Sequence, residues 1–348
     1  ESTEDNRRNY REMLFRTAGV NEFISGVILF DETIRQDGAD GTSMVKVLTD
    51  QGIIPGIKVD KGTIPLPESP DELVTEGLDG LRDRLKEYNE LGAGFTKWRA
   101  VISISKNTPT SYGLNANAHA LARFAAMSQE AGLVPIVEPE VLRDGDHDID
   151  RCEQVTTLTL NTLFDELYAQ DVSLEGMILK PNMVISGSDC GSQADVDEVA
   201  GRTVKCLKRC VPAAVSGIMF LSGGQSEEDA TAHLNAMNAK FGPAPWKLSY
   251  SYGRALQQSC LKAWQGDARN VSAAQAVLLE RAQLLRGNQP HLKQEQRQGA
   301  LEQVHEEGGN LAQTVAGEGT DQQAANHQHD PRAEQGFVGQ LAVGQADG

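Results

Sequence analysis

Seven short apolar runs alternate with helical patterns along the first 286 residues, and this alternation leaves few possible folds. Each run has the length of a strand and is far shorter than the ~18 apolar residues that suggest a membrane span. The runs lie at 26–30, 53–59, 95–104, 133–140, 176–180, 217–222 and 246–252, with helical patterns at 114–132, 150–170 and 195–210. Strands that alternate with helices predict a parallel α/β sheet.

Seven strands are one fewer than a closed parallel α/β barrel needs. The sequence also opens directly with a helix, which Ser2 or Thr3 can cap and whose first turn carries Glu4 and Asp5. Because a strand precedes the helix in a βα unit, we predict a barrel that lacks its first strand. The runs at 26–30 and 246–252 would then be unpaired edges, so we expect low stability and little or no catalytic activity. The alternative is an open doubly wound sheet, which needs no eighth strand.

The charge balance excludes several partners. The 348 residues carry a net charge of −17, so we expect no binding to nucleic acid, and an anionic ligand needs a local basic pocket. Other features of the sequence bear on its location. No apolar stretch is long enough to cross a membrane, and the N-terminus does not resemble a signal peptide. The five cysteines form no disulfide pattern, so we expect free thiols and a cytoplasmic location.

The composition changes near residue 286. Beyond this point Gln, Gly, Ala, Glu and His dominate, and Phe337 is the only aromatic residue. Such a segment cannot bury enough apolar surface to offset the entropy lost on ordering. We therefore predict a barrel domain over residues 1–286 and a disordered tail over residues 287–348.

Polar side chains collect at the carboxyl ends of the predicted strands. Residues two apart on a strand share a face, and this end of a parallel barrel forms the active site. The pairs are Lys58 with Asp60, Lys97 with Arg99, and Glu138 with Glu140, and the single residues are Lys180, Ser222 and Arg254. One such pair is typical of a solvated edge. Repetition on six strands predicts a shared polar mouth, where cations neutralise the glutamates.

Lys180 ends an apolar run that Pro181 stops. An apolar site and nearby cations both disfavour the charged amine, and a neutral amine is the nucleophile of Schiff-base chemistry. The competing interpretation is a lysine whose ammonium reaches solvent at the strand end. The other charged residues predicted at the same mouth favour the nucleophile.

Two loops after the last two strands have the composition of a phosphate site. Residues 221–225 read Leu-Ser-Gly-Gly-Gln and residues 251–254 read Ser-Tyr-Gly-Arg. Glycines let backbone N–H groups approach a phosphate, and Arg254 can bind one with two hydrogen bonds. The first loop also matches the signature of ABC-transporter ATPases, but the phosphate loop which that function requires is absent from the sequence.

A further polar cluster, Asp144 to Asp148, contains one histidine. No second histidine lies at ligand spacing, so we predict helix capping and turn formation in place of metal binding.

Taken in order, these segments resemble class I fructose-bisphosphate aldolases. The matching segments are 56–62, 97–99, 137–140, 179–183, 221–225 and 251–256, at the family's spacing between residues 3 and 285. The resemblance implies a TIM (β/α)8 barrel, usually a homotetramer, that needs no metal or other cofactor. It implies cleavage of fructose 1,6-bisphosphate to dihydroxyacetone phosphate and glyceraldehyde 3-phosphate, in glycolysis and gluconeogenesis.

The resemblance also implies a role for each matching residue. Lys180 matches the Schiff-base lysine, and Glu138 matches the acid/base that helps to expel water from the carbinolamine. Glu140 matches a carboxylate that orients the site, and Lys97 matches the lysine that keeps the pKa of the nucleophile low. The matching substrate-binding residues are Lys58, Arg99, Ser222, Gly223, Gly224, Ser251, Gly253 and Arg254, of which the last six match the site of the C1 phosphate.

The sequence departs from the family at both ends. The first-strand motif Ala-Ala-Asp-Glu-Ser-Thr-Gly and the Lys-Arg pair after it have no counterpart, and no tyrosine follows Tyr252. Two other functions therefore stay open. One is a catalytically silent protein that binds sugar phosphates or docks on cytoskeletal partners, and the other is a transaldolase-like Schiff-base lyase.

Overall fold

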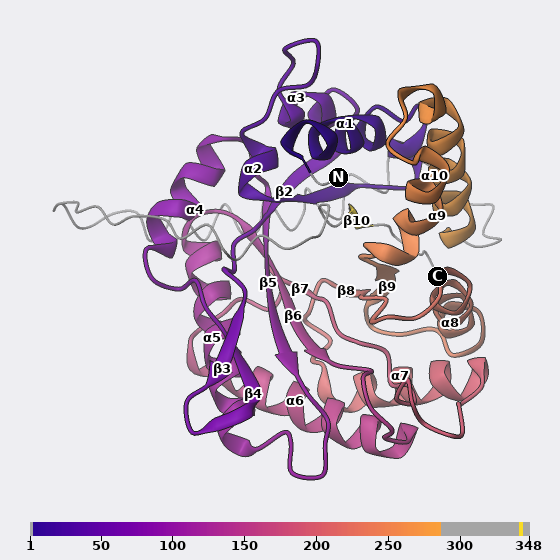
Figure 1. Cartoon of the computed structure of the whole chain (residues 1–348). Coiled ribbons are helices and arrows are strands. Elements are labelled where there is room, and N and C mark those ends of the chain that lie inside the picture. The colour runs from indigo at the N-terminus through magenta and orange to yellow at the C-terminus, as the bar shows by residue number, and fades with distance from the viewer. Residues whose placement is uncertain (1–2, 287–340, 344–348) are drawn as a thin grey trace, which may run out of the picture.

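The computed structural model describes residues 3–286 and 341–343 (Figure 1). Its main sheet is a curled half-barrel of seven parallel strands with helices around its outer side. The strands are β1 (Gly26–Leu29), β2 (Ile54–Lys58), β5 (Phe95–Ile102), β6 (Val134–Val141), β7 (Ile178–Leu179), β8 (Gly217–Phe220) and β9 (Lys247–Tyr250). Six of them lie within the predicted runs and β6 extends one residue beyond its run, so the predicted parallel α/β barrel architecture is confirmed.

The strand order excludes a doubly wound sheet. From β1 to β9 the parallel strands pair with their neighbours in chain order, whereas a doubly wound sheet reverses its order at a switch point. The hairpin of β3 (Thr63–Leu66) and β4 (Ser69–Thr75), which the apolar runs did not predict, forms a separate sheet after β2.

A short strand, β10 (Leu341–Val343), pairs antiparallel with β1 on the side away from β2. The prediction that the 26–30 run is an unpaired edge is therefore wrong, as is the prediction of disorder for residues 341–343. The rest of the predicted tail, 287–340 and 344–348, lies outside the described residues, and its disorder stays a prediction.

Ten α-helices lie in the described part of the chain. They are α1 (Glu4–Phe15), α2 (Asp31–Ile34), α3 (Met44–Thr49), α4 (Leu81–Glu90), α5 (Ser111–Glu130), α6 (Ile149–Ala169), α7 (Val196–Cys210), α8 (Glu227–Lys240), α9 (Arg254–Trp264) and α10 (Val271–Leu285), with 3-10 turns η1 (Val20–Glu22) and η2 (Ala268–Asn270). Thr3 caps α1 by accepting a hydrogen bond from the backbone N–H of Asn6, as predicted.

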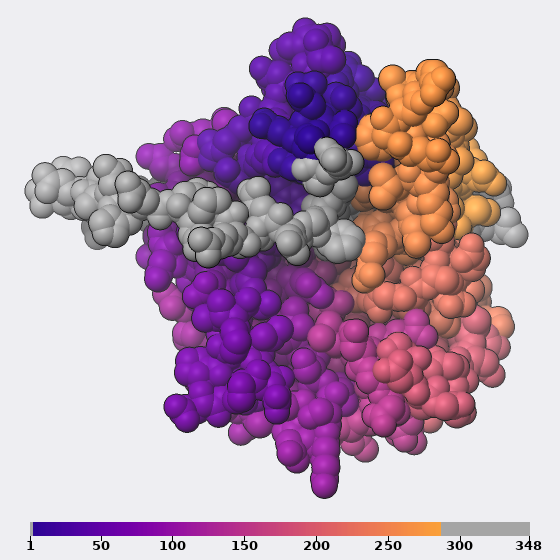
Figure 2. Space-filling model, in the orientation of Figure 1, coloured from indigo at the N-terminus to yellow at the C-terminus, as the bar shows by residue number. Residues whose placement is uncertain are grey.

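The first and last helices meet at one side of the molecule, where Figure 2 shows the indigo N-terminal segment beside orange α9 and α10. The rings of Tyr10 and Trp264 lie 5.1 Å apart between centroids, and the Tyr10 hydroxyl contacts Gln257 at 3.3 Å. Gln275 on α10 donates to the backbone oxygen of Met13 at 2.9 Å. These contacts join the two ends of the half-barrel through its helical layer.

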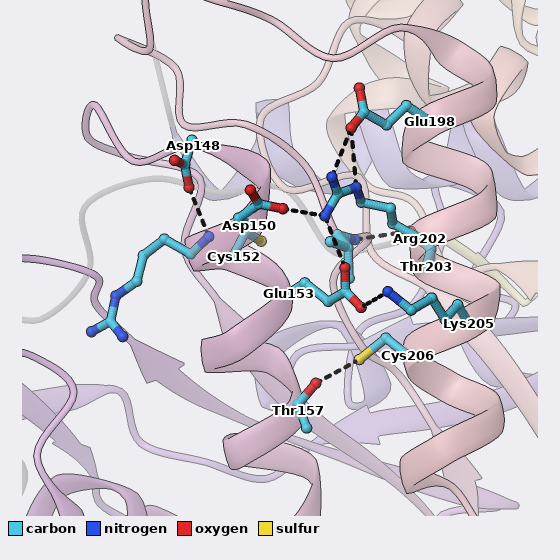
Figure 3. Close-up of polar contacts among 12 residues, drawn as sticks. Asp148, Asp150, Cys152, Glu153, Thr157, Glu198, Arg202, Thr203, Lys205 and Cys206 are labelled. Carbon is cyan, nitrogen blue, oxygen red and sulfur yellow. Dashed lines mark hydrogen bonds and ion pairs between the residues drawn. The ribbon is translucent and has the colours of Figure 1, made fainter.

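Polar contacts also join α6 to α7 on the outside of the sheet (Figure 3). Arg202 forms ion pairs with Asp150, Glu153 and Glu198, and Lys205 approaches Glu153 to 2.6 Å. Each exposed pair contributes little to stability, so the network mainly fixes how the two helices pack. The cysteines are free thiols, as predicted, and four of them are buried.

The two faces of the sheet have separate apolar cores. The larger core lies between the sheet and the helices. The smaller core fills the inside of the curl with apolar side chains from six of the strands: Ile28, Phe95, Val134, Ile136, Ile178 and Met219, with Ile54 against them. This inner layer is the floor on which the polar mouth rests.

The inner layer needs a glycine at position 56. Gly56 pairs with Phe95 on the neighbouring strand, and a Cβ atom at Gly56 would lie 2.2 Å from the Phe95 ring. We expect Gly56→Ala to lower the free energy of unfolding by about 1–3 kcal/mol, because overpacking displaces the ring or the strand. Denaturant unfolding measures the change.

Gly217→Ala is the matched control. Gly217 lies on the same inner face of β8, but a Cβ atom there has its nearest neighbour at 3.9 Å. The Gly217→Ala variant should unfold like the unmodified protein. Adding Phe95→Leu to Gly56→Ala should partly restore stability, because the smaller side chain leaves room for the new methyl group. Equal effects of the two alanine substitutions would contradict the packing argument.

Candidate active site

The strand register places the predicted charged residues on the inside of the curl. Lys58 on β2 pairs with Lys97 on β5, and Arg99 pairs with Glu138 on β6. Because side chains alternate along a strand, these residues share the inner face with the apolar floor and lie nearer the carboxyl ends. The spacing-based prediction of one shared polar mouth is confirmed for these strands.

Three charged side chains meet at the centre of the mouth. The Nζ atom of Lys97 lies 2.5 Å from Oε2 of Glu138, and the Nζ atom of Lys180 lies 3.0 Å from Oε1 of the same carboxylate. The side chains of all three are at most 2% exposed. Lys180 is therefore not a lysine that reaches solvent at a strand end.

One carboxylate between two lysines leaves an excess positive charge if both amines are protonated. Burial lowers the pKa of Lys180, and the charge of Lys97 lowers it further, although Glu138 opposes both effects. Burial alone would raise the pKa of Glu138, but attraction to the two lysines outweighs it and holds that pKa low. The arrangement therefore favours an ionised Glu138 beside a neutral amine at Lys180.

The rim of the mouth carries two further ion pairs. Arg99 pairs with Glu140, and Lys58 lies 2.6 Å from Asp60. The Arg99 and Lys58 side chains are 39% and 26% exposed, so both cations are accessible to a ligand. Asp60 also accepts a hydrogen bond from the backbone N–H of Arg99 at 3.3 Å, which links the ends of β2 and β5.

The two predicted phosphate loops lie beside the central lysine. The backbone N–H of Leu221 donates to the oxygen of Pro181 at 3.1 Å, and that of Ser251 donates to Phe220 at 2.9 Å. The ends of β7, β8 and β9 are thus adjacent. Gly223 and Gly224 have φ angles of +55° and +82°, a conformation that glycine adopts readily.

Ser251 adds a specific sign of a ligand. Its hydroxyl is buried, and it has no hydrogen-bond partner among the residues that the structure describes. A buried hydroxyl without a partner is costly, so a ligand oxygen at this position would stabilise the site. Gly253 precedes α9, and the exposed Arg254 is its first residue, so both lie at the same rim.

Two residues that support the site had no role predicted from the sequence. The side chain of Asn182 accepts from the backbone N–H of Val141 and donates to Thr156, which ties the loop after Lys180 to the end of β6. Arg84 donates to the backbone oxygens of Val59 and Gly77 and holds the loop after β2. Only their long-range contacts reveal these roles.

The aspartate cluster caps a helix, as predicted. Asp148 accepts a hydrogen bond from the backbone N–H of Arg151 at 2.8 Å, at the start of α6. Across residues 3–286, no group of three or more His, Cys, Asp or Glu side chains is arranged to hold a metal ion. The same residues include no helix that is long and apolar enough to cross a membrane.

Comparisons with known proteins agree with this geometry. Residues 1–307 match the family model described as fructose-bisphosphate aldolase class-I. A protein of Xanthomonas campestris named "Probable fructose-bisphosphate aldolase class 1" is 60% identical over 283 residues, which are 81% of this chain and 84% of that protein. "Fructose-bisphosphate aldolase 4, cytosolic" of Arabidopsis thaliana is 54% identical over 282 residues, covering 81% and 72% of the two chains.

The fold has a solved counterpart. The fructose-bisphosphate aldolase of Plasmodium falciparum, crystallised with TRAP and a small-molecule inhibitor, superimposes with a TM-score of 0.80 at 49% identity, covering 82% of each chain. Sequence and fold therefore match the same proteins over most of their length, and the chain belongs to the class I fructose-bisphosphate aldolase family.

Proposed function

We propose that this chain cleaves fructose 1,6-bisphosphate through a Schiff base on Lys180. The observation that carries the proposal is the buried group of Lys97, Glu138 and Lys180, which favours a neutral amine beside an ionised carboxylate. The relatives named as fructose-bisphosphate aldolases support the choice of substrate.

The chemistry begins at the Nζ atom of Lys180. It attacks the C2 ketone carbon to form a carbinolamine, and the ionised Glu138, which contacts Nζ, takes the proton that the nitrogen loses. The former ketone oxygen receives that proton from Glu138 and a second one from solvent, and it leaves as water. The protonated imine then accepts the electrons of the C3–C4 bond, while a carboxylate of the mouth takes the C4 hydroxyl proton. Glyceraldehyde 3-phosphate leaves, and the enamine is protonated at C3 and hydrolysed to dihydroxyacetone phosphate.

The remaining residues bind and orient the substrate. Ser222, Gly223, Gly224, Ser251, Gly253 and Arg254 would hold the C1 phosphate, which gives the unpartnered Ser251 hydroxyl an acceptor. Lys58 and Arg99 are the accessible cations of the rim, and Glu140 fixes Arg99. No step of this scheme requires a metal or other cofactor.

Family membership also supports two further proposals. One is a homotetramer, which light scattering of the purified protein would test. The other is a cytoplasmic location with a role in glycolysis and gluconeogenesis, consistent with the cytosolic Arabidopsis relative.

Borohydride trapping tests the nucleophile directly. Reduction in the presence of dihydroxyacetone phosphate should leave a stable adduct on Lys180, found by peptide mass mapping, and Lys180→Met should abolish it. An adduct without cleavage of the bisphosphate would favour the silent binding protein. A preference for monophosphate ketoses would favour the transaldolase-like lyase, and an adduct elsewhere would contradict the assignment of Lys180.

Glu138→Gln tests the proton transfer. The substitution keeps the side-chain volume but removes the acid/base, so we expect kcat to fall by about 10²–10⁴-fold. The Lys180 amine stays in place and should still react with the ketone. Cleavage measured with a coupled assay at near-normal kcat would refute the role of Glu138.

Lys97→Met tests the electrostatics of the buried group. Without Lys97, Glu138 pairs with Lys180 alone, and the pKa of Lys180 should rise. Trapping needs the neutral amine, so it increases as the pH rises through this pKa. We expect the pH of half-maximal trapping to shift upward in the variant; an unchanged or lower midpoint would contradict the assignment.

A further inference from the structure

A buried line of polar side chains runs from α8 to the loop after β8. The Nδ1 atom of His233 lies 2.6 Å from Oε1 of Gln225, and Nε2 of Gln225 donates to the backbone oxygen of Ser222 at 2.9 Å. All three residues are between 5% and 8% exposed. The mechanism above uses Ser222 but gives no role to Gln225 or His233.

The donors and acceptors along this line allow only one arrangement. The Ser222 oxygen accepts, so the Gln225 nitrogen must face it, and the Gln225 oxygen then faces His233. Because that amide oxygen can only accept, His233 must carry its proton on Nδ1. Burial lowers the pKa of His233, which favours the neutral ring with a single N–H.

This line of side chains ends on the turn over residues 222–225. The Ser222 oxygen accepts from both the backbone N–H and the side chain of Gln225, which closes the turn over residues 222–225. A Cβ atom at Gly224 would have no neighbour within 4 Å, so packing there does not fix the backbone. Gln225 also contacts the sulfur of Met183, near Lys180, at 3.6 Å.

We infer that His233 is a positioning residue, whose Nδ1–H orients Gln225 and thereby holds the 222–225 turn in shape for the C1 phosphate. This inference rests on the proposed function for the role of the turn. The ligand chemistry is a phosphate monoester at a carbon next to the reacting ketone. His233 itself does not touch the substrate.

Substitutions of His233 differ in whether they place an N–H group where the Nδ1–H of the ring lies. Asparagine places its amide nitrogen close to the position of Nδ1, whereas glutamine reaches the position of Nε2, and aspartate sets an acceptor against the Gln225 oxygen. We expect His233→Asn to retain phosphate affinity. We expect His233→Gln and His233→Asp to raise KM for the bisphosphate about tenfold, with kcat within about twofold, as the loss of one buried hydrogen bond implies.

Thr231→Val is the matched control for damage to α8. The Thr231 hydroxyl accepts a hydrogen bond from Arg281 and donates one to the backbone oxygen of Glu227, away from the line of side chains that joins His233 to Ser222. The variant should lose thermal stability without a change in KM. Trapping with dihydroxyacetone, which lacks the phosphate, should be equal in all soluble variants, whereas trapping with dihydroxyacetone phosphate should weaken only in the Gln and Asp variants.

Isothermal titration with inorganic phosphate separates this inference from the proposed function. Weaker phosphate binding in His233→Gln than in His233→Asn supports the positioning role even if the unmodified chain cleaves no bisphosphate. Equal phosphate binding in these two variants, or equal binding in the Gln variant and the unmodified chain, would overturn it. Absence of phosphate binding in the unmodified chain would overturn it as well.

Discussion

The site depends on the need to neutralise charge where water is excluded. Glu138 lies between two amines at the top of an apolar floor, and none of the three side chains can reach bulk solvent. Separation of Glu138 from Lys97 would leave an uncompensated buried charge, which costs several kcal/mol. The strands β5, β6 and β7 are therefore held in register by the same group that makes Lys180 reactive. Structural and chemical requirements coincide in these three residues.

The strands and the charged residues on their inner face were predicted from the sequence because both follow from local rules. Apolar runs mark the strands, two-residue spacing marks the inner face, and Pro181 marks the point where the run of Lys180 ends. The order of parallel strands follows from the short βα connections. Thr3 and Asp148 as helix caps were predictable for the same reason, since capping depends on the nearest residues.

The residues that support the site were not predictable, because they act through contacts with residues far away in the sequence. Asn182 bonds to Val141, and Arg84 bonds to backbone oxygens on both sides of the β3–β4 hairpin. The hairpin was missed because β3 is largely exposed and neither of its strands has a continuous apolar run. Gln225 was predicted as part of the phosphate loop over residues 221–225, but the hydrogen bond by which its side chain closes the turn was not.

The contacts between α1 and the last helices also constrain how the chain is made. Tyr10 bonds to a residue 247 positions later, and Met13 to one 262 positions later. Ribosomal synthesis runs from the N-terminus, so α1 emerges long before α9 and α10 exist to cover its apolar face. The helical layer can be completed only after α9 and α10 have been synthesised, and until then the exposed apolar face of α1 favours aggregation of the nascent chain.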